Sequence, residues 1–309
     1  MATTAPAVPS RLRIGRSARP VPIRRALGIG LVLVLFAVLW EGAKWLGGDP
    51  WRIHREFLGV RLDLEHVPPL QWRIASDLAL PHLWSILGSF GEISASSGQP
   101  LLVVLIQAAL YTLRTAFVGF AAGVALGLGL GIALVHSGLL ERALVPWVVA
   151  SQTVPIIAIA PVVVVAFGAS WQSVAMIATY LTFFPVTIAM VRGLRAFDPR
   201  AWELMRSYAA SKRQVLWKLR LPASVPYLFT GLRIAAAAAI VGTIIGELPS
   251  GIPEGLGSLI LNFNQYHTTS PERLWAVIVV TVFTGLIAVG LVRLAEVLLT
   301  RSRYRPKEG

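Results

Sequence analysis

The chain has 309 residues, of which 55% are hydrophobic and only 14% are charged, and its mean hydropathy is +0.68. A soluble globular domain carries about 25% charged residues, so this composition excludes an ordinary soluble protein. The absence of cysteine excludes disulfides and thiolate metal sites. The net charge of +13 lies mainly beside apolar stretches, where membrane topology explains it better than nucleic-acid binding does.

The N-terminal region combines a basic tail with an apolar stretch. Residues 1–25 contain six arginines and no acidic residue, and the apolar stretch covers 26–46. Cleaved signal peptides share this order of charge and hydropathy. However, no small-residue cleavage pattern follows, and Trp40 and Trp45 suit a membrane interface, where aromatic residues are enriched. We therefore expect a cytoplasmic tail at 1–25 and an uncleaved first transmembrane helix at 26–46.

A long segment, 48–104, follows the first span and contains Pro68, Pro69 and Pro81. We expect it to be a loop on the outer side of the membrane. A short amphipathic helix near 82–90 is expected to lie at the outer interface.

Five further apolar stretches lie within 105–300, which we expect to form the membrane core. Between Ala143 and Val191 there are 49 consecutive residues without a charge. Because a spanning helix needs about 20 residues, this stretch predicts two spans, divided near Gly168. The sequence thus predicts an all-α polytopic membrane protein with six transmembrane helices, at 26–46, 115–135, 143–167, 171–191, 222–246 and 274–292.

Basic residues are unequally distributed between the connecting segments. If both termini are cytoplasmic, the inner segments contain 20 basic and five acidic residues, whereas the outer segments contain five basic and nine acidic residues. Cytoplasmic loops of membrane proteins are enriched in Lys and Arg. We therefore expect the tails 1–25 and 301–309 to be cytoplasmic.

The inner segment between the fourth and fifth spans carries a regular pattern at 198–222. Asp198 is suited to cap a helix that begins at Pro199. A turn near 210–211 then leads to a second short helix. Periodicity alone does not distinguish a helix pair that binds a partner from one that simply lies on the membrane surface. One face of the first helix carries apolar side chains at helical spacing: Trp202, Met205 and Tyr208 or Ala209.

This segment resembles the EAA loop of binding-protein-dependent ABC importer permeases, whose pattern is Glu-Ala-Ala-x3-Gly-x9-Ile-x-Leu-Pro. Glu203 opens the pattern, Ala209 stands where the family has glycine, and Leu221-Pro222 closes it in register. Leucine and methionine replace the two alanines. A glycine would allow positive φ, so the sequence does not decide whether the backbone at Ala209 has the conformation of the family pattern.

The resemblance extends over most of 80–300. The nitrate/sulfonate/taurine type of permease is similar at three further places: Ser151 to Pro161 with Phe167-Gly168, Thr230-Gly231-Leu232-Arg233, and Glu247 with Gly255-Leu256-Gly257. This resemblance implies the type I importer permease fold, with cytoplasmic coupling helices between spans 4 and 5. It also implies a location in the bacterial cytoplasmic (inner) membrane.

The resemblance implies a permease that forms the solute pathway and pairs with a second copy of itself. Two cytoplasmic ABC ATPase subunits would bind it, and an extracytoplasmic binding protein would deliver the solute. The chain would bind no cofactor, because the ATPases hydrolyse ATP with Mg²⁺; its sequence has no G-x4-G-K-[S/T] loop. The implied solute is a small anion such as nitrate, a sulfonate, taurine or bicarbonate. The alternative is a vitamin precursor or another small organic solute.

Two sets of site residues follow. Glu203 and Arg206 are expected to pair one helical turn apart. The residues expected at the ATPase contact are Trp202, Glu203, Met205, Arg206, Tyr208, Ala209, Leu221 and Pro222. Polar residues within spans are the candidates for the solute pathway, although Ser and Thr there also serve helix packing. These candidates are Gln152, Thr153, Tyr180, Thr182, Arg233, Thr243 and Glu247.

Two of these candidates have open roles. Arg233 either attracts an anion or satisfies carbonyls between helices. Glu247 is a gate, a docking point for the binding protein or a simple interfacial carboxylate.

Two rival classes fit less well. An ion-coupled secondary transporter needs ionisable residues at mid-membrane in several spans, and only Arg233 meets this condition. A membrane-embedded enzyme needs His, Asp or Glu gathered at membrane depth. We therefore expect neither a catalytic residue nor a metal site.

Overall fold

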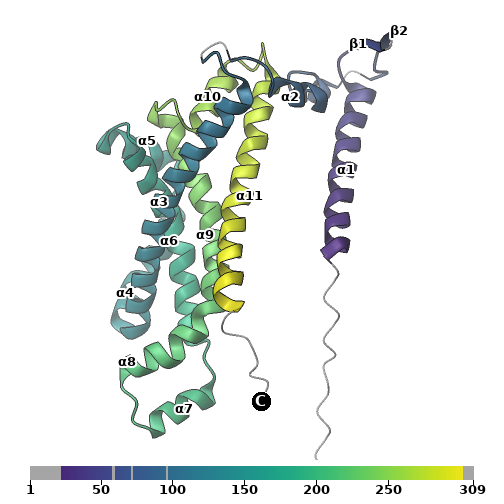
Figure 1. Cartoon of the computed structure of the whole chain (residues 1–309). Helices are drawn as coiled ribbons and strands as arrows, with labels where there is room; N and C mark the ends of the chain where they lie inside the picture. Colours follow the sequence, from purple (N-terminus) through teal and green to yellow (C-terminus); the bar gives the residue numbers. More distant parts are fainter. Residues whose placement is uncertain (1–21, 58–59, 71, 95–96, 302–309) are drawn as a thin grey trace, which may run out of the picture. The chain divides into compact units, whose positions relative to one another are not determined.

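The computed structural model describes residues 22–57, 60–70, 72–94 and 97–301 (Figure 1). The chain forms two compact units, Met1–Leu83 and Trp84–Gly309, which are described in turn. The tail expected at 301–309 lies outside the described residues except for Arg301, and most of the tail expected at 1–25 does so as well.

The first unit contains one long helix and a hairpin. Helix α1 (Pro22–Gly47) carries exposed apolar side chains from Leu27 to Leu39, as a helix in lipid does. Strands β1 (Trp51–Phe57) and β2 (Val60–His66) pair antiparallel. This hairpin departs from the all-α expectation. Apolar and charged residues alternate along β2, which is the period of a strand and not of a helix.

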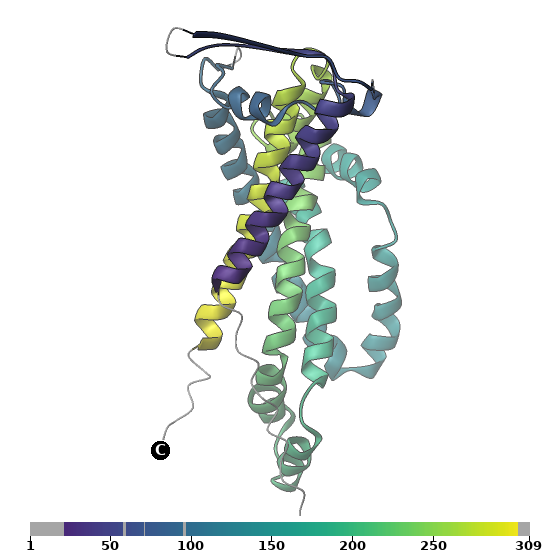
Figure 2. The same cartoon turned by 90° about the vertical axis from the view of Figure 1, so that its right-hand side faces the viewer.

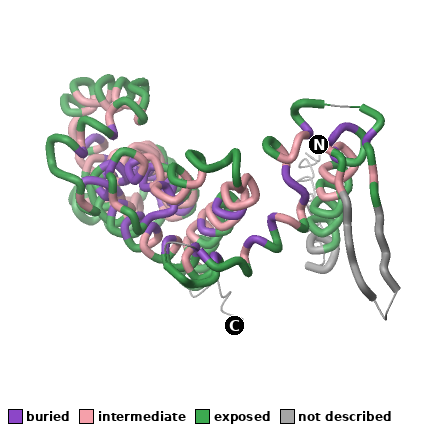
Figure 3. The backbone as a smooth tube through the Cα atoms, turned by 90° about the horizontal axis from the view of Figure 1, so that it is seen from above, coloured by how far each residue is buried: buried purple, intermediate pink, exposed green. Residues whose placement is uncertain are grey.

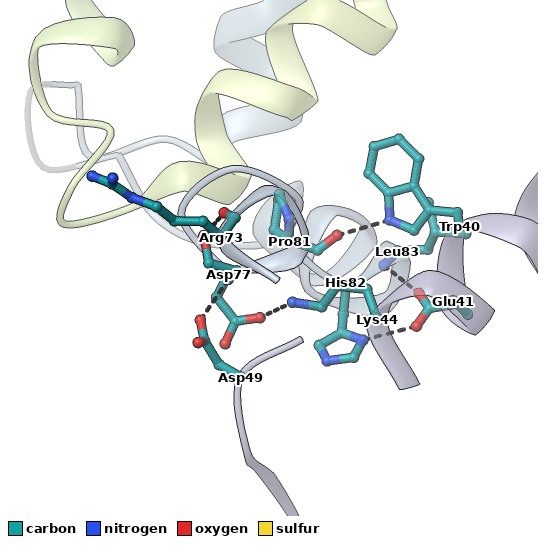
Figure 4. A network of polar contacts seen from close by, with 10 residues as sticks. Trp40, Glu41, Lys44, Asp49, Arg73, Asp77, Pro81, His82 and Leu83 are labelled. Carbon is teal, nitrogen blue, oxygen red and sulfur yellow. Dashed lines mark hydrogen bonds and ion pairs between the residues drawn. The ribbon is translucent and has the colours of Figure 1, made fainter. Parts of the chain in front are cut away.

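A polar network holds the segment after the hairpin to the end of α1 (Figure 4). Lys44 is fully buried and forms an ion pair with Asp77. The Glu41 carboxylate lies 2.8 Å from Nδ1 of His82 and accepts a hydrogen bond from the Leu83 backbone N–H at 2.7 Å. The short helix η1 (Arg73–Ala75) lies in this segment. Charges at the end of an apolar helix are tolerated here because each has a partner.

The second unit is a helical bundle (Figures 1 and 2). Four long helices form it: α3 (Leu101–His136), α6 (Trp171–Arg195), α9 (Leu221–Ser250) and α11 (Pro271–Arg301). The shorter elements are α2 (Leu83–Ser89), α4 (Gly138–Ser151), α5 (Ile156–Phe167), α7 (Pro199–Ser207), α8 (Lys212–Val215), the π-helical turn η2 (Leu216–Arg220) and α10 (Leu256–Gln265). Within the described residues, five helices are long and apolar enough to cross a membrane, and the bent pair α4–α5 would be a sixth.

Small residues let α3 approach α6 closely. A Cβ added at Gly123 would lie 2.5 Å from the Thr182 Cβ, and one at Gly131 would lie 2.7 Å from the Met190 Cβ. This spacing of small residues favours close packing between helices in lipid, where no hydrophobic effect drives helices together. Figure 3 shows the buried residues inside the bundle, with exposed residues around it.

Helix α3 begins at Leu101, whereas the sequence places the start of the second span at 115 to exclude Arg114. The Arg114 guanidinium lies 5.7 Å from the centre of the Trp171 ring. A cation over an aromatic face is stabilised electrostatically, which explains how the helix accommodates this charge.

The span expected at 143–167 is bent. Helices α4 and α5 meet at 96°, and Pro155 lies between them. Proline has no N–H to continue the helical hydrogen bonding. The Ser151 carbonyl at the end of α4 accepts a hydrogen bond from the Tyr180 hydroxyl instead. Gly168, with φ of +85°, separates α5 from α6 where the sequence divides the two spans.

Candidate solute cleft and coupling segment

Residues 198–222 form a helix-turn-helix at one end of the second unit, and we call them the coupling segment (Figure 1). Helix α7 begins at Pro199, and the Asp198 carboxylate accepts the Arg200 N–H at 2.9 Å, so the expected cap is present. Ala209 adopts positive φ, +49°, as the glycine of the family pattern can. Its neighbour Ala210 donates its N–H to the Met205 carbonyl at 3.0 Å, which closes α7 with a Schellman motif.

The second half of the coupling segment runs directly into α9. Ser211 and Gln214 form a capping box that starts α8. The turn η2 follows, in which the Leu221 N–H bonds the Leu216 carbonyl, and α9 begins at Leu221. The turn and second helix expected after 210–211 are therefore present, and the Ser-x-x-Gln pattern is a known signal for the helix start. No loop therefore separates α8 from α9.

The exposed apolar residues include one of the expected contact residues, Tyr208, and two that the sequence does not predict, Leu204 and Trp217. Leu204, Tyr208 and Trp217 are 58%, 79% and 63% exposed. Trp202 is half-buried, because its ring lies against Phe197 with the Arg220 guanidinium 5.6 Å from its centre. Met205 is also half-buried.

The remaining expected contact residues lie as follows. Glu203 and Arg206 are exposed, and no ion pair joins them in the described part of the chain, contrary to the expected pairing. Leu221 is half-buried and Pro222 is exposed in the first turn of α9.

A cleft of about 650 Å³ lies between α6 and α9, beside the bend of α4–α5. Of the expected pathway residues, Gln152 lines it. Its lining residues recur every three or four positions along both long helices, so a helical wheel would have revealed the shared face. The lining from α6 includes Leu181, Phe184, Ile188 and Arg192, and that from α9 includes Tyr227, Thr230, Ile234 and Ala238.

Arg233 does not line this cleft. Its guanidinium lies 3.6 Å from the Glu296 carboxylate on α11, and it donates a hydrogen bond of 3.3 Å to the Thr230 hydroxyl. The charge of Arg233 is therefore compensated within the chain.

Four other expected pathway residues serve local structure. Tyr180 bonds the Ser151 carbonyl at the bend. Thr153 is exposed and donates to the Ala150 carbonyl at 2.8 Å. Thr182 and Thr243 are fully buried in helix contacts.

Glu247 is also buried, and its carboxylate joins three helices. One oxygen accepts the Thr112 hydroxyl of α3 at 2.9 Å, and the other accepts the Gly257 N–H at the start of α10 at 2.8 Å. A Cβ at Gly255 would lie 2.5 Å from either carboxylate oxygen. We call Thr112, Glu247, Gly255 and Gly257 the Glu247 clamp. Because the Glu247 side chain has no exposed surface, it fits neither a docking point for the binding protein nor an interfacial carboxylate, and the gate stays a prediction.

Among the described residues, no three His, Cys, Asp or Glu side chains gather in a way that could hold a metal ion. Some charged groups of the second unit form ion pairs between segments. Glu141 of α4 pairs with Arg195 at 2.6 Å, and Glu92 pairs with Arg273 at 2.9 Å.

Residues 123–304 match the family described as the inner membrane component of binding-protein-dependent transport systems. The chain belongs to this family. The formylaminopyrimidine transport permease protein ThiX of Halalkalibacterium halodurans is 40% identical over 47% of this chain, but the match spans only 58% of ThiX. The riboflavin transport system permease protein RibX of Chloroflexus aurantiacus is 31% identical over 76% of this chain and 75% of RibX.

A solved structure shares the fold. A chain of the MetNI methionine ABC transporter, in an inward-facing conformation, superposes with a TM-score of 0.57 at 20% identity, over 67% of this chain and 99% of that chain. The predicted resemblance to ABC importer permeases and the predicted polytopic helical fold are confirmed. The family consists of integral membrane components.

Proposed function

We propose that the chain is the non-catalytic permease subunit of a binding-protein-dependent ABC importer, and that solute crosses the membrane along the cleft between α6 and α9. The coupling segment is the observation that carries this proposal. It presents Leu204, Tyr208 and Trp217 to solvent on an otherwise polar, basic stretch. Exposed aromatic and aliphatic residues in such a setting are typical of a docking surface.

The same segment accounts for the transmission of movement. We infer that an ATPase docks on α7 and α8 and that closure of the ATPases on ATP and Mg²⁺ displaces them. Because α8 and η2 run into α9, and α9 lines the cleft, the displacement tilts one wall of the pathway. Rigid-body movement of packed helices is a common form of such switching.

The proposed assembly has two ATPase subunits, a second copy of this chain and a binding protein at the end that carries α10. We place it in the bacterial cytoplasmic membrane with both tails in the cytoplasm. The 20 basic residues of the inner segments support that orientation. Two kinds of solute are open: a small anion, as the sequence resemblance implies, and a small organic solute, as the names of ThiX and RibX suggest.

Glu203→Lys tests the docking surface. Glu203 is exposed on α7, so its reversal should leave membrane insertion intact. We expect the purified variant to lose its ATPase subunits in mild detergent and ATP-dependent uptake to fall to background. Glu254→Lys is a matched control for retention of the ATPase subunits, because Glu254 is also exposed but lies in the loop before α10, away from the coupling segment. Unchanged uptake in Glu203→Lys would exclude the docking role.

A further inference from the structure

Helix α7 lies apart from the packed part of the second unit. Figure 1 shows it below the ends of α6 and α9, with a loop on either side. None of its nine residues is buried. The hydrogen bonds at its two ends, to the Asp198 carboxylate and to the Ala210 N–H, are local to the coupling segment. A displacement of α7 would therefore be absorbed by these loops unless a further contact attached α7 to the long helices.

Arg220 provides such a contact. Its guanidinium lies 5.6 Å from the centre of the Trp202 ring on α7 and 5.3 Å from the centre of the Phe197 ring, which follows α6 in the chain. The centres of the two rings are 5.7 Å apart. We call Phe197, Trp202 and Arg220 the Arg220 stack. It joins the end of α6, the helix α7 and the turn η2, from which α9 continues.

The two rings are the partners of the Arg220 cation. Its Nε atom is buried and has no hydrogen-bond partner among the described residues, and no carboxylate of these residues forms an ion pair with it. A cation over an aromatic face is attracted by the ring electrons. The guanidinium is planar and weakly hydrated, so it stacks on such faces better than the compact, strongly hydrated ammonium of lysine. Arginine at position 220 is therefore well suited to hold α7 in place.

The Arg220 stack also lies at the end of both walls of the cleft. The last lining residue of α6 is Arg192, shortly before Phe197, and the first lining residue of α9 is Pro226, shortly after Arg220. Both walls thus continue into residues of the stack. The chain from α8 through η2, in contrast, continues into the α9 wall alone.

We propose that Arg220 is a positioning residue that makes α7 move together with both walls of the cleft. An ATPase docked on α7 then acts on α6 and α9 at once, as a rigid-body displacement of packed elements. The inference rests on the proposed function and deepens it by naming the residue that transmits the movement. Without the Arg220 stack, α7 would follow the ATPase while the cleft kept its shape.

Cysteine labelling measures the response of the cleft, because the sequence has no cysteine. Ile234→Cys places a thiol in the cleft, at a residue that is 58% exposed. The measurement is the rate at which N-ethylmaleimide modifies this thiol in the permease–ATPase complex, without nucleotide and after trapping with ATP, Mg²⁺ and vanadate. If trapping shifts about nine molecules in ten to a state in which the thiol is differently accessible, the rate changes by about tenfold.

Arg220→Gln should reduce this change to less than about twofold while the ATPase stays bound in mild detergent. Arg142→Gln is the matched control and should leave the change intact, because Arg142 is an exposed arginine of α4 outside the coupling segment. A full change in Arg220→Gln would overturn the proposal. Loss of the ATPase from Arg220→Gln would overturn it too, because Arg220 would then support docking. No change in the parent Ile234→Cys chain would instead refute the proposed function, so the two failures are distinguishable.

Variants of Trp202 test the same stack from the side of α7. Trp202→Phe keeps an aromatic face beside the guanidinium and should keep the response of the cleft. Trp202→Leu removes the face and should reduce the response as Arg220→Gln does. Equal responses of these two variants would overturn the role of the stack. Because both variants keep Arg220, they also decide the question if Arg220→Gln fails to fold.

Discussion

The Glu247 clamp and the coupling segment differ in the side chains that they bury and expose. The clamp buries a carboxylate completely and satisfies it with hydrogen bonds from two other helices. The coupling segment satisfies its backbone locally, through the Asp198 cap, the Schellman motif and the Ser211 capping box, and leaves apolar side chains exposed. One region therefore satisfies its polar groups within the chain, and the other leaves apolar side chains exposed where we propose that the ATPase docks.

This difference suggests that the two ends of α9 have different roles. The clamp fixes the end of α9 near α10 against α3, and the coupling segment continues the opposite end. A helix fixed at one end and displaced at the other tilts, which changes the cleft between. Substitutions should therefore affect stability at the clamp and assembly at the coupling segment.

The largest effect is expected from Glu247→Ala. It leaves the Thr112 hydroxyl and the Gly257 N–H without their acceptor in a buried site, and each such loss costs about 1–3 kcal/mol, to which a cavity adds. We expect the free energy of unfolding to fall by about 3 kcal/mol or more, as measured by denaturation in mixed detergent micelles. Glu254→Ala, at an exposed position nearby, should change it by less than about 0.5 kcal/mol. Equal effects would show that the clamp is not stabilising.

The double substitution Leu204→Ala with Tyr208→Ala should weaken binding of the ATPase and leave the stability of the permease unchanged. Both side chains are exposed, so the unfolding free energy should change by less than about 0.5 kcal/mol. The affinity for the ATPase should fall by about 2 kcal/mol, or roughly 30-fold, as for interface anchors. Titration of the purified ATPase onto nanodisc-embedded permease measures this. Undiminished affinity would place the docking surface elsewhere.

A small stabilisation is expected from Ala209→Gly. The positive φ of 49° strains a residue with a Cβ by about 1–2 kcal/mol, and the greater freedom of glycine in the unfolded chain offsets part of the gain. We expect about 0.5–1 kcal/mol of added stability, measured by the same denaturation in mixed detergent micelles. Ala210→Gly, next in the chain and without positive φ, should not stabilise. Stabilisation by both would contradict the strain at Ala209.

Much of the architecture can be predicted because its causes are local. The length of apolar stretches indicates the spans, and Gly168 marks the break between two of them through its backbone freedom. The bend at Pro155 interrupts a stretch that the sequence predicts as one span. Asp198 and Pro199 define the start of α7 in the same way. The hairpin β1–β2 lies where the sequence analysis expects a loop, although the alternation of apolar and charged residues along β2 has the period of a strand.

The chain alone thus determines that this is a polytopic membrane protein, which of its stretches enter the bilayer, and where its coupling segment begins and turns. These features depend on hydropathy, charge and backbone conformation within a few residues. The tertiary structure decides the roles of the polar residues within the helices. Glu247 meets Thr112 across 135 residues, and Arg233 meets Glu296 on another helix. Such partners depend on how closely the helices approach one another. That distance depends on the glycines of α3 and also on the side chains of the helix that they face.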